Sequence, residues 1–418
     1  MRGRRRGQRR AQRPFRFSDR GTKFAIFAQP RTLGFEPETV SLRARPGSIA
    51  AGPRDRSIHV IDARHKFSYR RDDTLAFRAH PPYRGPRFPG ARPRRGHFDH
   101  LGAGSRAFEA AATFAVVRIT LEIWEHYLRR RVPWHFRGTF GPSLEVIPRV
   151  RSNNAWSGDG YLEFGYPDYP DPGERQHPFC TNFEVVAHET GHLILKSVIG
   201  TMPDDEKSLM HRAHEEAAAD LVAVLAALQF ETVLAFALER TRGKLFSINP
   251  ISRIGAWGPR SFDRLRTIFN GSTMSDVRAR RNLDKYVLAR PFAGGAFDTF
   301  VEIFEGNLVD AGAISSRLAA ASRHAPHTAI PRLQRQFDAR YAQHPAAFRR
   351  ALVGARDTFA RLLAATWTLT GRDGVTFAGV VTNMLAADRA LSGARSGRYG
   401  DVIRRVFAAR EIEPHSSR

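Results

Sequence analysis

The sequence reads HETGH over residues 188–192 and EAAAD over residues 216–220. On an α-helix, residues four apart lie one turn above each other on one face, so His188 and His192 can direct ring nitrogens at a common point. Glu189 lies about 100° further around the helix, where it can hold a water molecule beside a metal ion without being a ligand. The first segment is therefore predicted to be a helix with a metal site on one face.

The residues around HETGH support this helix. Thr181 and Glu184 have the spacing of a capping box, and Gly200 is a plausible stop. Gly191 costs the helix about 1 kcal/mol relative to alanine, which a well-packed helix tolerates. Five apolar residues recur at helical spacing and are predicted to face the core: Phe183, Val186, Ala187, Ile194 and Val198.

A catalytic zinc ion usually has three protein ligands and one water, so two histidines leave it one protein ligand short. Glu215 and Glu216 compete for that role. If Glu216 is the ligand, Asp220 lies one turn further on the same face and can accept the other N–H of a ligating histidine. If Glu215 is the ligand, Ala219 takes that place and has no acceptor. The sequence favours Glu216.

Chance is the alternative explanation of each motif taken alone, because HExxH occurs in ordinary helices and acidic residues commonly form a solvated helix face. Here residues 183–194 and 221–228 are strongly apolar. Charged side chains embedded in such segments need partners, and a shared cation is an economical one. The combination predicts one zinc ion per chain.

These motifs resemble those of the thermolysin-like metallopeptidases, the gluzincins, whose third zinc ligand is a glutamate. Residues 153–156 are similar to the family's edge strand, residues 158–165 to the strand after it, and residues 110–127 to its long helix. Residues 398–409 are similar to its final helix, so the resemblance covers about residues 105–412. It implies an α+β fold of the zincin type, with a mixed β/α lobe, a mainly helical C-terminal lobe and the zinc site at their junction.

The resemblance implies a zinc-dependent hydrolase that cleaves peptide bonds in a peptide or protein substrate. Glu189 would be the general base that takes a proton from water at the metal. The edge strand would bind the substrate backbone, with polar contacts from Asn154 and Ala155.

Two departures from the family limit what is carried over. Tyr286 falls where many members have an oxyanion-stabilising histidine, and its hydroxyl can donate the same hydrogen bond. An ordinary tyrosine at a helix entrance, just before a helical segment 292–304, is the alternative. Ala227 replaces a carboxylate that the family has seven residues after Asp220, which makes the family's double calcium site doubtful.

The pattern along the chain predicts four segments. Over residues 1–104, little regular structure is expected beyond short strand-like runs at 57–61 and 74–77. Residues 80–100 are predicted to be an irregular connection. A β region is expected near 143–166, and helices over 346–369 and 377–391. The predicted segments are a basic disordered tail (1–22), an Arg/Pro-rich part with short strands (23–104), a zincin catalytic lobe (105–275) and a helical C-terminal lobe (276–412).

The 418 residues are 42% hydrophobic, enough to bury a sizeable core. The single cysteine, Cys180, excludes an intrachain disulfide and is expected to be a buried thiol. The longest apolar run, residues 221–238, is interrupted by polar residues and is predicted to form core helices and no transmembrane segment. The first thirty residues lack the apolar block of a signal peptide, so the expected location is cytoplasmic.

The formal net charge of +25 comes mostly from arginine and predicts salt-sensitive affinity for polyanions. The basic run 2–13 would bind nucleic acid or an anionic surface without specificity. Two other functions stay open: a protease recruited to nucleic acid, and a non-catalytic zinc-binding module, against which the intact Glu189 counts. Four further histidines are interpreted as surface or core residues: His211, His214, His324 and His327.

Overall fold

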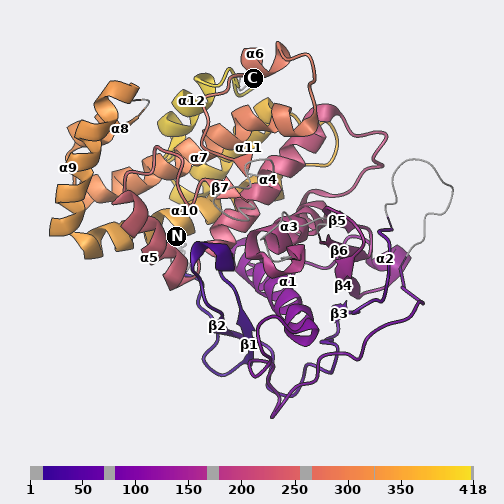
Figure 1. Cartoon of the computed structure of the whole chain (residues 1–418). Coiled ribbons are helices and arrows are strands. Elements are labelled where there is room, and N and C mark those ends of the chain that lie inside the picture. Colours follow the sequence, from indigo (N-terminus) through magenta and orange to yellow (C-terminus); the bar gives the residue numbers. More distant parts are fainter. Residues whose placement is uncertain (1–12, 70–80, 167–177, 255–265, 324, 416–418) are drawn as a thin grey trace, which may run out of the picture.

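The computed structural model describes residues 13–69, 81–166, 178–254, 266–323 and 325–415. In these residues helices predominate and the strands form small sheets, which confirms the α+β class predicted from the sequence. Helices α3 and α4 lie centrally, with the larger sheet on one side and the mainly helical C-terminal part on the other (Figure 1).

The larger sheet has the strand order β3-β4-β6-β5, so β5 is an edge strand. β3 and β6 run parallel to β4, whereas β5 is antiparallel to β6. This confirms the strand-like run at 57–61, the β region near 143–166 and the edge strand, whereas the run at 74–77 lies outside the described residues. The strands are β1 (Thr22–Ile26), β2 (Glu38–Leu42), β3 (Ile58–Val60), β4 (Leu144–Val150), β5 (Ala155–Gly158), β6 (Tyr161–Gly165), β7 (Arg253–Ile254) and β8 (Arg266–Thr267).

Helices form where the sequence predicts them, from the long helix before the sheet to the final one. The described residues also contain short 3₁₀ turns, and residues 81–100 have no regular helix or strand. The α-helices are α1 (Arg106–Leu128), α2 (Arg137–Phe140), α3 (Phe183–Ile199), α4 (Leu209–Ala227), α5 (Glu231–Thr241), α6 (Met274–Arg278), α7 (Lys285–Asp310), α8 (Ser316–Ser322), α9 (Ile330–Gln343), α10 (Pro345–Leu369), α11 (Phe377–Ser392) and α12 (Gly400–Ala408).

The start of α3 differs from the prediction. Asn182 is the N-cap, and its side chain accepts a hydrogen bond of 3.2 Å from a backbone N–H of the first turn. The predicted capping box of Thr181 and Glu184 is wrong, because Glu184 is buried and accepts a 2.9 Å hydrogen bond from the Gln29 side chain. Gly200 ends the helix as predicted, with a positive φ of 104°.

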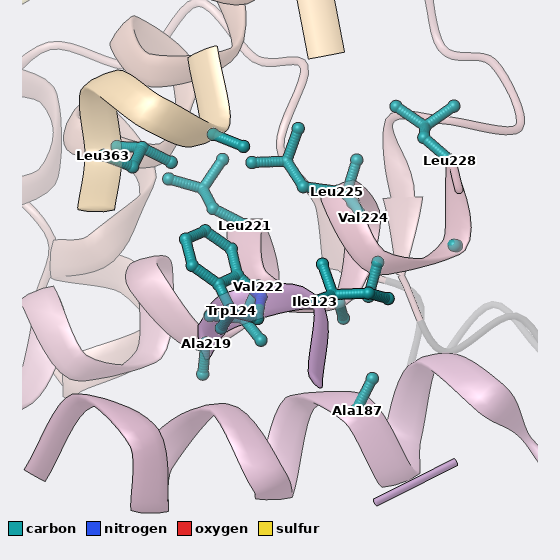
Figure 2. Close-up of a cluster of buried hydrophobic side chains, with 14 of the residues drawn as sticks. Ile123, Trp124, Ala187, Ala219, Leu221, Val222, Val224, Leu225, Leu228 and Leu363 are labelled. Atoms are coloured by element: carbon teal, nitrogen blue, oxygen red, sulfur yellow. The ribbon is translucent and has the colours of Figure 1, made fainter. Parts of the chain in front are cut away.

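Close packing of α3 against α4 depends on small residues. A Cβ atom at Gly191 would lie 3.1 Å from Val222 Cβ and 3.2 Å from Ala219 Cα, closer than ordinary van der Waals contact. The facing residues of α4 are alanines and branched aliphatics within a buried cluster that also contains Trp124 of α1 and Leu363 of α10 (Figure 2). The glycine therefore lets the two helices approach closely. This close approach is a reason for a glycine at a position where alanine would favour the helix more.

The main core joins the sheet side of the molecule to the helical side. Trp124 of α1 and Trp367 of α10 are both fully buried, with ring centroids 4.8 Å apart. The core also includes Phe15, which lies within the segment 1–22 and packs against Phe17 at 5.5 Å. Residues 1–12 of that segment lie outside the described residues.

The apolar run 221–238 divides between the end of α4 and most of α5, and residues 221–228 are all buried. Cys180, just before α3, is also buried, and burial raises the pKa of its thiol. No single helix in the described ranges combines the length and apolarity needed to span a membrane. Only α4 and α5 taken together reach them, by length and composition, and that pair is bent by 100°.

Helix α7 begins earlier than the segment 292–304 predicted from the sequence. Asp284 is its N-cap, and its side chain accepts a 2.7 Å hydrogen bond from Val287 N–H. Pro291 lies inside the helix, a position that removes one backbone hydrogen bond. The early start places Lys285 and Tyr286 in the first turn of a helix that packs against α4.

Candidate metal centre

Three side chains from α3 and α4 converge on one point. The Nε2 atoms of His188 and His192 are 3.1 Å apart. The carboxylate of Glu216 lies 3.5 Å from His188 Nε2 and 3.8 Å from His192 Nε2. Tetrahedral zinc with bonds of about 2.0–2.1 Å requires its ligand atoms to be about 3.3 Å apart, so these residues fit one ion. Among the described residues, these three form the group whose ligand atoms all lie within 4.8 Å of one another, close enough to share a metal ion.

Burial sets the charge state of His192. His188 and Glu216 are each only 4% exposed. Burial, opposed by the Glu216 carboxylate and aided by the neighbouring His188, lowers the pKa of His192 to about 3. His192 is therefore neutral near pH 7, the form in which an imidazole nitrogen can bind a metal.

Asp220 lies behind His188 on the side away from the convergence point. Its Oδ1 is 2.8 Å from His188 Nδ1, and both side chains are buried. A proton on Nδ1 leaves the lone pair of Nε2 directed toward His192 and Glu216. This is the relation between a ligating histidine and an outer carboxylate that orients metal sites in general.

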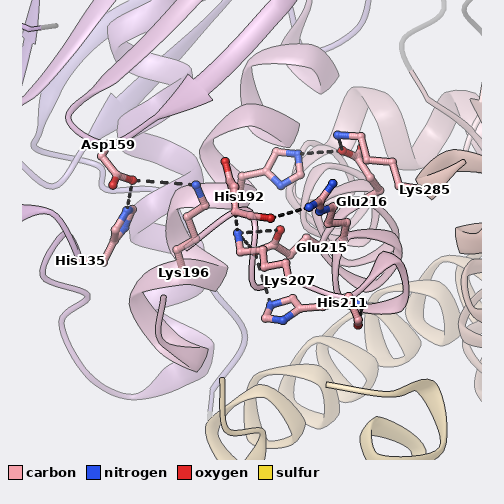
Figure 3. Close-up of polar contacts among 12 residues, drawn as sticks. His135, Asp159, His192, Lys196, Lys207, His211, Glu215, Glu216 and Lys285 are labelled. Carbon is pink, nitrogen blue, oxygen red and sulfur yellow. Dashed lines mark hydrogen bonds and ion pairs between the residues drawn. The ribbon is translucent and has the colours of Figure 1, made fainter. Parts of the chain in front are cut away.

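The competing residue, Glu215, points to a different set of partners. Its carboxylate oxygens lie 3.1 and 3.2 Å from Lys207 Nζ, and His211 Nε2 is 3.7 Å away (Figure 3). Glu216 turns toward His192 instead. The geometry therefore supports the choice of Glu216 that the helix spacing favoured.

Lys285 is a site residue that the sequence reasoning missed. Its Nζ donates a 2.6 Å hydrogen bond to Glu216 Oε1, which joins the first turn of α7 to the metal centre (Figure 3). Burial opposes its charge, but the Glu216 carboxylate and Tyr286 outweigh burial and raise the pKa of Lys285. The available signal was its position beside Tyr286, which the family resemblance had singled out.

The remaining predicted site residues surround the centre. Tyr286 follows Lys285 in the first turn of α7 and is 45% exposed, with its ring centre 4.9 Å from Lys285 Nζ. Glu189 is half-buried on α3 beside His188. Ala155 begins the edge strand β5, and the backbone carbonyl of Asn154 accepts a 2.9 Å hydrogen bond from β6. The functional roles of these four residues stay predictions.

The other histidines lie apart from the three converging side chains. His211 is buried beside Glu215, whereas His214 is fully buried and its ring packs edge-on against Phe292 at 5.3 Å. Burial lowers the pKa of His214 to about 3. His327 is exposed. These three agree with their interpretation as core or surface residues, and His324 lies outside the described residues.

Comparison with known proteins gives likenesses in structure alone. No protein-family model matches the chain, and no curated protein sequence matches it. Among solved structures, the precursor of protealysin, a metalloproteinase from Serratia proteamaculans, is similar to it, with a TM-score of 0.46 and 10% sequence identity. That likeness covers 85% of this chain and 87% of the protealysin precursor chain.

Proposed function

We propose that this protein is a zinc-dependent peptidase of the gluzincin type, which hydrolyses peptide bonds with Glu189 as general base. His188, His192 and Glu216 would hold the ion. The observation that carries the proposal is that the two imidazole nitrogens and the Glu216 carboxylate lie 3.1 to 3.8 Å from one another, close to the separation of ligand atoms around one tetrahedral ion. The HExxH order supplies the base beside that site.

The buried residues around the site prepare it for a divalent cation. The two imidazoles would contribute ring nitrogens, that of His192 neutral because burial lowers its pKa, and Glu216 would contribute one negative charge. Asp220 holds the ring of His188 in its binding orientation through the 2.8 Å contact at Nδ1. When bound, zinc polarises a peptide carbonyl and brings the pKa of a water molecule toward 7.

Glu189 would move the proton that amide hydrolysis requires. It follows His188 directly, so its side chain leaves α3 about 100° around the helix, next to the ligands and half-exposed to solvent. Its carboxylate would take the proton of the attacking water and pass it to the leaving nitrogen. The amine product would then leave without a negative charge.

The edge strand offers a binding place for an extended peptide. β5 pairs only with β6 among the described strands and packs against α3. A substrate backbone added along this edge would form main-chain hydrogen bonds, with Ala155 and Asn154 at its beginning. Tyr286 would donate its hydroxyl to the negative charge that develops on the carbonyl oxygen.

The test compares wild-type protein with Glu189→Gln. We expect one zinc ion per chain in both, cleavage of casein by the wild type that a chelator stops, and a loss of turnover of about 10³-fold or more in the variant. Glu215→Gln is the matched control, because Glu215 is the neighbouring carboxylate that contacts Lys207 and His211 instead. Casein cleavage by Glu189→Gln at the wild-type rate would refute the mechanism. Zinc binding without any peptidase activity would favour the non-catalytic module.

A further inference from the structure

Lys285 lies beside the candidate metal centre, in contact with Glu216. Its ammonium contacts the same Glu216 oxygen, Oε1, that is 3.8 Å from His192 Nε2. The side chain of Lys285 is 35% exposed, whereas that of Glu216 is 5% exposed. The partly exposed side chain of Lys285 therefore extends from solvent to the buried Glu216 carboxylate.

Two other lysines near the site have carboxylate partners of their own. Lys207 lies 3.1 Å from Asp204 and 3.1 Å from Glu215. Lys196, one turn beyond His192 on α3, lies 3.9 Å from Asp159 (Figure 3). These pairs leave little positive charge for a ligand.

Lys285 differs because its partner is itself a proposed metal ligand. In the described part of the chain, Glu216 is the carboxylate within ion-pair distance of Lys285. A divalent cation bound to Glu216 withdraws that carboxylate's attraction and adds a second positive charge close to the ammonium. With the ion present, Lys285 thus has a surplus of charge that an anionic group can satisfy.

We propose that Lys285 is a specificity-determining residue that binds a carboxylate of the substrate beside the scissile bond. The inference rests on the proposed peptidase function and names its substrate class, peptides with an anionic group at that place. The edge strand β5 packs against α3, which carries the two histidines. Lys285 belongs to α7, which packs against α4, the helix that carries Glu216. The exposed ring of Tyr286 lies beside the ammonium. The carboxylate comes from an acidic side chain or from the free carboxyl terminus.

The test uses zinc-loaded Glu189→Gln protein, which keeps bound peptides intact. Three fluorescent peptides share a sequence chosen from a library digest by the wild type. The first has glutamate residues flanking the cleavage site and an amidated terminus, the second has glutamine there and the same amide, and the third has glutamine and a free carboxylate close to that site. We expect about tenfold tighter binding of the first or the third than of the second. If the first peptide binds more tightly, the carboxylate comes from an acidic side chain; if the third does, it comes from the free carboxyl terminus.

A second substitution assigns the preference to Lys285. Lys285→Met in the same protein is expected to remove the tenfold difference between the charged and uncharged peptides, whereas Lys285→Arg retains it. Lys196→Met is the matched control, because Lys196 is a neighbouring lysine already paired with Asp159, and it is expected to keep the preference. Equal affinity for all three peptides while Lys285 is present, or a preference that survives Lys285→Met, overturns the proposal.

Zinc content separates this inference from the function beneath it. A wild-type protein without zinc or chelator-sensitive cleavage would remove the peptidase proposal itself. A protein that binds zinc and cleaves peptides, yet binds charged and uncharged ones equally, would remove only the role of Lys285. The equal-affinity outcome is read in protein with an intact Lys285, so it does not depend on the folding of any Lys285 variant.

Discussion

Two buried clusters of ionisable side chains can be compared, one on the larger sheet and one between α3 and α4. In the first, which we call the sheet cluster, Glu163 of β6 pairs with Lys66 and accepts hydrogen bonds from Ser68 Oγ at 2.8 Å and Tyr69 N–H at 2.9 Å. The Tyr69 hydroxyl donates a 2.7 Å bond to Glu145. Each carboxylate of the sheet cluster thus meets donors or a cation supplied by nearby strands and loops.

The metal centre is built differently. Two imidazole nitrogens and the Glu216 carboxylate face one another at 3.1 to 3.8 Å, and the ammonium in contact with that carboxylate comes from α7, which is distant in sequence. A buried charge needs a partner in either case. The comparison teaches that the charges of the sheet cluster serve the fold, whereas the arrangement between α3 and α4 also brings nitrogen and oxygen ligand atoms together and is suited to an exchangeable cation. Four substitutions can break or sharpen this contrast.

His192→Ala has the largest expected effect. It removes a ligand atom from the centre, so we expect the bound zinc to be lost and peptidase activity to fall by about 10³-fold or more, since the metal supplies several kcal/mol of transition-state stabilisation. Metal analysis of the purified variant and a casein assay measure both. The sheet cluster should stay intact, with an unchanged circular dichroism spectrum. Wild-type zinc content in this variant would contradict the ligand assignment.

Lys66→Met tests the other side of the comparison. Lys66 is buried and pairs with the fully buried Glu163, so its loss leaves a carboxylate without its cation. We expect the free energy of unfolding, measured by urea titration, to fall by about 3–5 kcal/mol. Lys66→Met combined with Glu163→Gln should recover part of that loss, and zinc content should not change. A stability equal to that of the wild type would show that the pair is not a structural element.

Asp220→Ala should weaken metal binding without abolishing it. The carboxylate contacts His188 Nδ1 at 2.8 Å, and removing such an outer partner typically lowers metal affinity by about 10–100-fold. Competition with a chromophoric chelator measures the zinc dissociation constant. Asp220→Asn, which keeps an acceptor oxygen, should lose less affinity than alanine. Equal affinity in wild type and Asp220→Ala would remove Asp220 from the centre.

His214→Phe has the smallest expected effect and is visible in acid. Burial lowers the pKa of His214 to about 3, whereas a histidine of the unfolded chain titrates near 6.5. Between these values the unfolded state binds more protons, so stability falls as the pH falls from 6.5 toward 3, by about 1.4 kcal/mol per unit.

Neither ring nitrogen of His214 has a hydrogen-bond partner among the described residues, so phenylalanine removes the titration without breaking a bond. Between pH 7 and 5.5, the variant should lose about 1.3 kcal/mol less unfolding free energy than the wild type. Urea titrations at the two pH values measure this difference. Parallel losses in the two proteins would show that His214 does not couple folding to pH.

Local patterns in the sequence were enough for the helices and for the convergence of the three proposed ligands. His188 and His192 are one turn apart, so a helix alone places them together. The choice of Glu216 over Glu215 followed from the same periodicity, because Asp220 is one turn beyond Glu216. The edge strand followed from the family resemblance of residues 153–156. In each case the spacing within one element, or a motif, carried the information.

Contacts between distant positions could not be predicted in this way. Lys285 meets Glu216 across 69 positions, and Gln29 meets Glu184 across 155. Both contacts depend on how elements pack in three dimensions, which periodicity within one element does not encode. The second contact also explains the wrong capping box, because Glu184 is drawn into the core, and Asn182 caps α3 where Thr181 was expected to.

The missing side chain of Gly191 has a consequence for the choice of ion. Because a Cβ atom at this position would press against Val222 at 3.1 Å, a single added methyl would force α3 and α4 apart by a few tenths of an ångström. His188 and His192 belong to α3 and Glu216 belongs to α4, so the distance between the proposed ligands on the two helices would increase by a similar amount. The separation of the proposed ligands on α3 and α4 thus depends on Gly191, a residue that contributes no ligand atom.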